Sequence, residues 1–361
     1  EVVTELEYGT DLALINNRLN LSLTSYIQKT EDAILEFPVA PSTGYAYTLK
    51  NAATIENKGL EISLDAELIE TTNQTYSAEI NYSQNINQVT SLAGSENISV
   101  GGFAGAAAYA VEGEPYGVLR GNDWLYNSEG KYVLDENNFP QINPEETIIG
   151  DPNPDWLGSV RFSWDYKSTL RISALIDIKY GGDIWNGTKG ALYFFGAHNE
   201  TTLQSKVPYW VTQGGMVTGY KTWYGEDIAK LPDIIDNGNG TLTFRGYIED
   251  FGGGKVAITE DAFHDGPFSG FTGPASQFIE DGSYMKLREI SLSYLYSGDL
   301  IKTFGIQSLD FALTLRNIHT WTNYSGIDPE TNLAGTSNVR GLDYFGNPQA
   351  RSILFSMTVN I

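Results

Sequence analysis

The connections between the strand-like stretches of this chain constrain its fold more than any other feature. They alternate between short and long from one end of the sequence to the other. Neighbouring antiparallel strands run in opposite directions, so all long connections should lie at one end of the sheet and all short ones at the other. The short ones are expected at residues 16–17, 70–74, 167–168 and 297–307, and the long ones at 31–54, 90–156, 182–283 and 323–348.

Two of these long connections far exceed the ~12–15 residues usual for structureless loops in compact domains. Bacterial outer-membrane barrels combine short periplasmic turns with long extracellular loops. The alternation of short and long connections therefore favours an outer-membrane barrel over a soluble sandwich.

Nine stretches alternate apolar and polar residues, as expected of a strand with one apolar and one wet face. Between residues 18 and 30, for example, Leu19 and Leu21 share one face, whereas Asn20 and Ser22 share the other. The expected strands are 2–15, 18–30, 55–69, 74–89, 157–166, 169–181, 284–296, 308–322 and 349–361.

The alternation slips by one position in two of these strands. The slips lie near Arg288-Glu289 and near Arg316-Asn317, and they predict a β-bulge, which inserts one extra residue into a strand. The run Asp151-Pro152-Asn153-Pro154 predicts a rigid connection into the next strand, because proline fixes φ and removes an amide donor.

We therefore expect an all-β fold, an antiparallel transmembrane β-barrel, with residues 1–361 forming one section of it. Nine strands are an odd number, whereas bacterial single-chain barrels have an even number. The missing strands are expected in an upstream part of the same polypeptide or in a second chain. Mean hydropathy is -0.24, and no run approaches the ~18 apolar residues of a membrane helix. The chain starts without the features of a signal peptide, so a signal is either removed or lies upstream.

The formal net charge of -23 comes largely from acids in the long loops. Such a surface repels nucleic acid and favours neutral or cationic ligands, although it also suits a merely solvated loop surface. His198, His264 and His319 lie far apart, cysteine is absent, and the sequence carries no serine-hydrolase or metalloprotease motif. We therefore expect no catalytic residues and no enzyme.

A short run in the longest loop offers oxygen ligands for Ca²⁺, the one cofactor considered. The ligands would be Asp233, Asp236, Asn237 and Asn239, but the run lacks the full twelve-residue pattern and its closing Glu. Asn-Gly is also a strong hairpin signal. A short hairpin between Ile234 and Phe244 is the favoured interpretation. A similar external hairpin is expected from Tyr126 to Val133.

The 182–283 loop is rich in aromatic side chains, which offer flat faces for stacking sugars or gripping peptide side chains. Three uses remain open: an internal core of the loop, docking of a surface lipoprotein, and contact with a substrate. The candidate binding residues are Trp185, Tyr193, Phe194, Tyr209, Trp210, Trp223 and Tyr224.

Six ordered motifs cover nearly the whole chain. They are residues 57–64 (NKGLEISL), 149–156 (IGDPNPDW), 181–188 (GGDIWNGT), 281–294 (DGSYMKLREISLSY), 315–330 (LRNIHTWTNYSGIDPE), and 341–344 (GLDY) with 348–351 (PQAR). Together they resemble the C-terminal part of SusC/RagA-type TonB-dependent transporters. The resemblance departs at the last residue, because the family's closing strand commonly ends in an aromatic residue and this one ends in Ile361.

The resemblance implies a 22-stranded outer-membrane barrel with extracellular loops, of which this chain would supply the last nine strands. An N-terminal plug would fill the barrel, and an N-terminal region would contact TonB. It implies a nutrient importer that takes up glycans or peptides together with a SusD-like surface lipoprotein. The cargo stays open between these two classes. The alternative function is that of a passive barrel or surface adhesin, whose acidic, aromatic loops bind partners without active transport.

Overall fold

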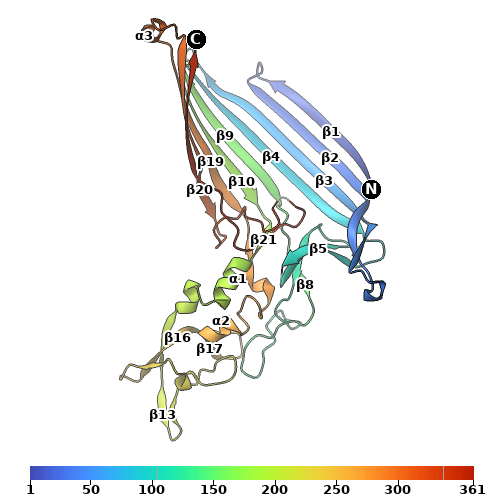
Figure 1. Cartoon of the computed structure of the whole chain (residues 1–361), viewed down its shortest axis with the longest axis vertical. Helices are drawn as coiled ribbons and strands as arrows, with labels where there is room; N and C mark the ends of the chain where they lie inside the picture. Colours follow the sequence, from blue (N-terminus) through green and yellow to red (C-terminus); the bar gives the residue numbers. More distant parts are fainter. Residues whose placement is uncertain (104, 336) are drawn as a thin grey trace.

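One large curved sheet dominates the computed structural model, which describes residues 1–103, 105–335 and 337–361. Its nine strands pair antiparallel, and in the described part of the chain the sheet is open, with β1 at one edge and β22 at the other (Figure 1). Across the sheet the strands are β1 (Val2–Leu14), β2 (Leu19–Pro38), β3 (Tyr47–Glu70), β4 (Gln74–Ser91), β9 (Trp156–Tyr166), β10 (Leu170–Tyr180), β19 (Tyr284–Tyr296), β20 (Ser308–Thr322) and β22 (Ser352–Asn360).

These nine strands are the nine expected from the sequence, and seven of them agree to within a few residues at both ends. The tight turn between β9 and β10 is also confirmed. Lys167 and Ser168 have φ of 51° and 50°, as the central residues of a type I′ turn require, and the Thr169 amide donates to the Tyr166 carbonyl at 3.0 Å. The antiparallel barrel-type sheet predicted from alternation and connection lengths is therefore present.

The predicted bulge lies between β19 and β20. Leu287 pairs with His319 and Glu289 with Arg316, so the register shifts by one residue, with the extra residue on β20. Against β10, Leu287 pairs with Ile176 and Glu289 with Leu175, so there Arg288 is the extra residue of β19. An extra residue on one strand reverses which face the following side chains take. As a result Arg288 and Glu289, although consecutive, both reach ion-pair partners on the polar face of the sheet.

The expected long loop at 31–54 is wrong for most of its length. The hairpin of β2 and β3 continues through it as far as the pair Pro38 and Tyr47. Asp32 has φ 58°, and the register shifts on both sides of Ala33. This irregularity breaks the two-residue period, so alternation could not follow the strand further. A cluster of buried residues supports the extension: Ala33, Ala52, Ala53, Val89, Leu92, Ile98 and Ala110.

The other long connections fold into small units at one end of the sheet, opposite the end that carries the C-terminus and α3 (Figure 1). Residues 97–150 contain a sheet of β5 (Asn97–Phe103), β6 (Ala106–Val111), β7 (Val118–Gly121) and β8 (Thr147–Gly150). The short connection 297–307 contains α3 (Asp299–Lys302). Long and short connections thus lie at opposite ends, as expected.

Residues 182–283, named the loop unit below, form a compact body of short elements. One buried cluster joins them to β6 and β7, and a second lies between β12 and β16. The elements are β11 (Asp183–Asn186), α1 (Gly187–Phe194), η2 (Asn199–Thr202), β12 (Gln204–Pro208), β13 (Trp210–Thr212), β14 (Gly215–Val217), η3 (Ile228–Lys230), β15 (Ile235–Asp236), β16 (Thr241–Asp250), β17 (Lys255–Thr259), α2 (Glu260–His264), η4 (Ala275–Phe278) and β18 (Ile279–Asp281).

The two faces of the large sheet differ sharply. On one face Ile80, Ile172 and Phe355 are 40%, 37% and 69% exposed, and no layer of the described chain covers them. Apolar patches of this extent mark a surface that contacts lipid or another protein. The opposite face carries serine, threonine, asparagine and charged side chains. No helix in the described residues is long and apolar enough to cross a membrane.

Candidate functional site

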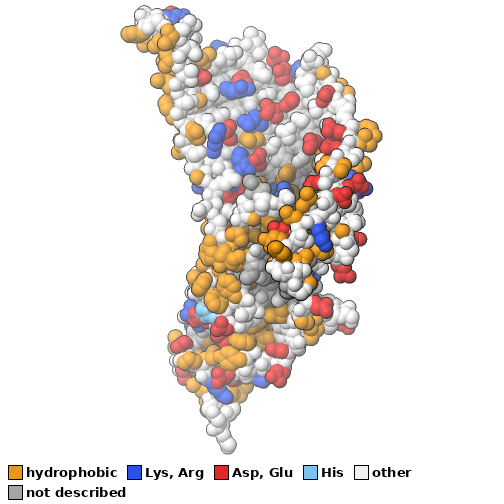
Figure 2. All heavy atoms as spheres, turned by 45° about the vertical axis from the view of Figure 1, so that its right-hand side comes forward, with side chains coloured by type: hydrophobic (Ala, Val, Ile, Leu, Met, Phe, Trp, Pro, Cys, Tyr) orange, Lys and Arg blue, Asp and Glu red, His pale blue; other side chains and the backbone are white. Residues whose placement is uncertain are grey.

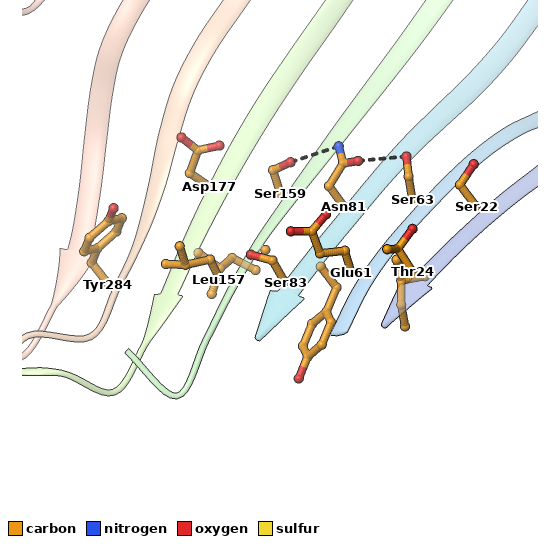
Figure 3. A pocket seen from close by; sticks show the side chains of 14 residues that line it. Ser22, Thr24, Glu61, Ser63, Asn81, Ser83, Leu157, Ser159, Asp177 and Tyr284 are labelled. Carbon is orange, nitrogen blue, oxygen red and sulfur yellow. Dashed lines mark hydrogen bonds between the residues drawn. The ribbon is translucent and has the colours of Figure 1, made fainter. Parts of the chain in front are cut away.

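A groove of about 520 Å³ crosses the polar face of the large sheet (Figure 3). Register brings polar positions of neighbouring strands side by side, so Asn81 of β4 pairs with Ser63 of β3 and with Ser159 of β9. The Ser63 hydroxyl donates to Asn81 Oδ1 at 2.9 Å, and Asn81 Nδ2 donates to Ser159 Oγ at 3.4 Å. The polar residues that line the groove are Ser22, Thr24, Glu61, Ser63, Asn81, Ser83, Ser159, Asp177 and Tyr284.

The flank of this face formed by β1 to β3 is acidic. Glu5, Glu7 and Glu61 line a second cavity of about 360 Å³ beside the groove. Gln28 Nε2 donates to Glu5 Oε2 at 3.0 Å. Figure 2 shows Asp and Glu side chains gathered toward this flank, and Lys and Arg side chains toward the other. This acidic flank of the large sheet, called the wall below together with the rest of the sheet, favours ligands that carry cationic or hydroxyl groups.

The opposite flank pairs its charges across the strands. Arg161 of β9 lies 3.5 Å from Glu79 and 3.7 Å from Glu289, and Arg316 Nε lies 3.0 Å from Glu289. These side chains remain partly exposed, so each pair contributes only ~0–1 kcal/mol to stability. Their main effect is to leave little uncompensated charge on this side of the wall.

A tighter group of charges lies where the groove meets β19. We name it the Glu330 cluster: Asp177, Tyr284, Lys286, Arg288, Asp328 and Glu330.

The cluster joins β19 and β10 to the connecting segment, residues 323–349. Arg288 donates to Glu330 Oε1 at 2.7 Å and to Asp177 Oδ2 at 2.6 Å. Lys286 is only 2% exposed, and its ammonium donates to Asp328 Oδ1 at 3.2 Å and also to Glu330. A buried ammonium needs such partners, because an isolated charge is very costly to remove from water.

The ionisation of Glu330 reflects these partners. Burial by itself would raise the pKa of this carboxyl, but hydrogen bonds from Arg288, Lys286 and Tyr284 outweigh burial and lower the pKa to about 2. Hydrogen bonds to the charged form of a carboxyl act in this direction. Glu330 therefore remains an anion at any physiological pH, and the cluster stays paired.

The aromatic residues predicted to bind a ligand separate into two groups. Trp185 and Tyr193 are buried, and with partly buried Trp223 they pack into the apolar cluster of the loop unit. For these three the internal-core alternative is the one that the structure supports. The Tyr193 hydroxyl also donates to the Glu200 carboxylate. Burial, and after it the hydrogen bond and negative charge of Glu200, raise the pKa of Tyr193.

The remaining aromatic candidates keep part of their surface free. Trp210 and Tyr224 are 54% and 47% exposed. Phe194 is partly buried and contacts Phe271 edge to face. Tyr209 is also partly buried, and its hydroxyl lies 3.3 Å from each carboxylate oxygen of Asp236. Contact with a ligand or a partner stays a prediction for these residues.

The run considered for Ca²⁺ forms a hairpin. Asp236 pairs with Leu242, and its carboxylate accepts from the Gly238 amide at 2.9 Å. Asn237 uses its side chain on Thr241 and Thr243, while Asn239 accepts from Thr241 and Asp233 is exposed. Among the residues that the structure describes, no group of three or more His, Cys, Asp or Glu side chains is placed to hold a metal. Calcium binding here stays a prediction.

Sequence reasoning did not select the Glu330 cluster as a site. A signal was present, because Lys286 and Arg288 lie in the motif 281–294, and Asp328 and Glu330 lie in the motif 315–330. The motifs were visible separately. Their meeting at one point depends on how residues 323–349 fold back onto β19, which spacing along the chain cannot show.

The chain is similar over its whole length to several TonB-dependent receptors. It is 24% identical to TonB-dependent receptor P39 and 25% identical to TonB-dependent receptor P3, both of Formosa agariphila, over 99% and 100% of this chain. It is 21% identical to SusC of Bacteroides thetaiotaomicron over 100% of this chain. Homologues named TonB-dependent receptor or SusC thus cover nearly the whole chain.

The match covers about a third of each relative: 35%, 34% and 32% of their lengths. Among solved structures, a RagAB peptide transporter superposes with a TM-score of 0.66 at 18% identity, covering 99% of this chain and 35% of that one. The fold is therefore that of the C-terminal part of a TonB-dependent β-barrel. No family model matches the chain.

Proposed function

We propose that this chain is the C-terminal barrel section of a TonB-dependent outer-membrane importer of nutrients. The observation that carries the proposal is the sheet itself, which is apolar and uncovered on one face and carries a groove lined mostly by polar residues on the other. A barrel wall with lipid outside and a wet lumen inside has this pattern. The similarity to TonB-dependent receptors supports it.

The proposed cargo is a glycan or a peptide. Both classes present hydroxyl or amide groups, and the row Ser63–Asn81–Ser159 offers donors and acceptors to either. The proposed partners are a SusD-like surface lipoprotein and TonB, the latter through a part of the protein outside this chain. The exposed Trp210 and Tyr224 of the loop unit are the residues proposed for contact with lipoprotein or cargo.

Uptake by cells tests the proposal. Cells producing the full-length protein would be given fluorescent oligosaccharides and oligopeptides, with TonB present or deleted. We expect one class to enter only with TonB and with an energised inner membrane. Binding without entry in both backgrounds would favour the adhesin alternative, and entry independent of TonB would favour the passive barrel.

A pair of adjacent residues tests the groove. Asn81→Leu removes the central member of the polar row, whereas Ile80→Leu alters its neighbour on the apolar face of the same strand. We expect Asn81→Leu to raise the KM of uptake several-fold and Ile80→Leu to leave uptake unchanged. Equal uptake by both variants at equal surface amounts would show that cargo does not use this groove.

A further inference from the structure

The connecting segment, residues 323–349, contacts two bodies of the molecule. On one side it reaches the wall through the Glu330 cluster. The wall residues of that cluster include Asp177 and Tyr284, and both also line the groove. Asp177 accepts from Arg288 at 2.6 Å, and Tyr284 donates to Glu330 Oε1 at 2.8 Å. Tyr284 thus faces the groove and contacts the segment directly, whereas Asp177 faces the groove and contacts the segment through Arg288, which donates to Glu330.

On its other side the connecting segment is joined to the loop unit. Its strand β21 (Leu342–Asp343) pairs in parallel with β11, and β11 pairs with β18. Leu342 is fully buried in the apolar cluster that also contains Trp185. The Phe345 amide donates to Thr188 Oγ1 at 2.7 Å, at the start of α1.

Tyr324 and Ser325 tie the start of the segment to its other end and to the loop unit. Tyr324 donates to Asp343 Oδ2 of β21 at 2.6 Å, and the Ser325 amide donates to Glu280 Oε2 of β18 at 2.7 Å. Tyr324 is 4% exposed, and Asp328 and Asp343 are buried as well. Few of these groups can find water in place of a lost partner, so a shift at one end has to be accommodated at the other.

We propose that the connecting segment is a mechanical link between the groove and the loop unit. A ligand group that engages Asp177 or Tyr284 in the groove competes with Arg288 and Glu330. The contacts of Arg288 and Tyr284 with Glu330 then weaken, and the resulting shift of the segment reaches β11 and α1 through β21. Because coupling free energy is reciprocal, displacement of the loop unit also alters the cluster at the groove. This goes beyond the proposed import and does not depend on it.

Hydrogen exchange with mass spectrometry on the full-length protein in lipid nanodiscs tests the link. Glu330→Gln removes the charge that Arg288 and Lys286 share. We expect exchange to rise roughly tenfold or more in residues 323–349, and also to rise in residues 183–194 of β11 and α1. Asp177→Asn, made from the groove side, should produce a smaller rise in the same two regions.

The matched control is Glu289→Gln. Glu289 is also on β19 and pairs with Arg161 and Arg316, but both of these partners lie on the wall. This variant should leave both regions unchanged. A rise confined to residues 323–349 in Glu330→Gln would overturn the link, and so would equal effects of Glu330→Gln and Glu289→Gln.

Tyr324→Phe tests the other direction and guards against a Glu330 variant that fails to assemble. It removes one hydroxyl, the donor to Asp343, and leaves the ring in place. The expected result is a several-fold faster reaction of the buried Lys286 with an amine-specific reagent, read as modified peptide. Unchanged reactivity of Lys286, together with faster exchange near Asp343, would contradict the proposal.

Discussion

The loop unit and the connecting segment are both long excursions from the same end of the sheet, yet different forces hold them. The loop unit packs around its own apolar clusters, built from residues such as Trp185, Phe244 and Phe278. The connecting segment contributes one buried leucine, Leu342, with partly buried Val339 and Tyr344 packed against the same cluster, and charges hold it to the large sheet. A long loop with enough aromatic residues can form a core, whereas one without them depends on partners elsewhere.

Removal of a core side chain should produce the largest loss of stability, and this loss should be in the loop unit. Trp185 is 2% exposed, so we expect Trp185→Ala to lower the free energy of local opening in the loop unit by about 3–5 kcal/mol. Hydrogen exchange of residues 183–281 measures it. Trp210→Ala, at an exposed tip, should change the same quantity by no more than about 0.5 kcal/mol. Equal losses would remove the distinction between core and surface aromatics.

Loss of the buried ammonium should act mainly on the connecting segment. We expect Lys286→Ala to lower its free energy of opening by about 3 kcal/mol, because Asp328 is left buried without a cation. Proteolysis within residues 323–348, scored against cleavage in β13–β14, measures the effect. Faster cleavage in β13–β14 alone would show that charges do not hold this segment.

Acid should release the connecting segment in a defined pH range. The pKa of Glu330 is lowered to about 2 from an ordinary 4.5. Its contribution is fully present above pH 4.5 and is lost as the pH falls from there through about 2. Pepsin cleavage between pH 4.5 and 2 should therefore increase within residues 323–348, and Glu330→Gln should abolish that increase. A release that begins above pH 5 in the unmodified protein would argue against this carboxylate.

A smaller effect is expected from one carboxylate inside the loop unit. Asp227 accepts from the amides of Ala229 and Gly219 at 2.9 Å and 2.8 Å. Burial opposes ionisation here, but these hydrogen bonds prevail and lower its pKa. Asp227→Ala should cost about 1 kcal/mol of local stability around η3, as loss of a helix cap does. Asp233→Ala, at an exposed position, is the control, and exchange of residues 216–231 is the measurement.

The smallest effect is expected from an exposed ion pair of the wall. Arg316 pairs with Glu289, but its side chain is 55% exposed. Arg316→Gln should change the thermal midpoint of the assembled barrel little, consistent with ~0–1 kcal/mol for such pairs. A loss as large as that of Lys286→Ala would mean that exposure does not separate the two kinds of charge contact.

Much of the sheet could be predicted because strand geometry is local. Side chains alternate with a period of two, and one face of each strand is apolar while the other is polar, so Leu21 and Ser22 identify their faces from sequence alone. The bulge at Arg288 was also visible, because an inserted residue reverses the alternation at once. The same logic failed at Asp32, where the hairpin continued beyond an irregular step.

The sequence by itself determined most of the strands, the end of the sheet at which the long connections lie, and which strand positions are polar. Tertiary structure alone decided that Trp185 and Tyr193 are core residues while Trp210 is exposed. It also brought Lys286 to Glu330, 44 residues further along the chain. The physical reason is that alternation reports the environment of a single strand. Burial of an aromatic ring and pairing of a charge depend instead on which distant segment folds back beside it.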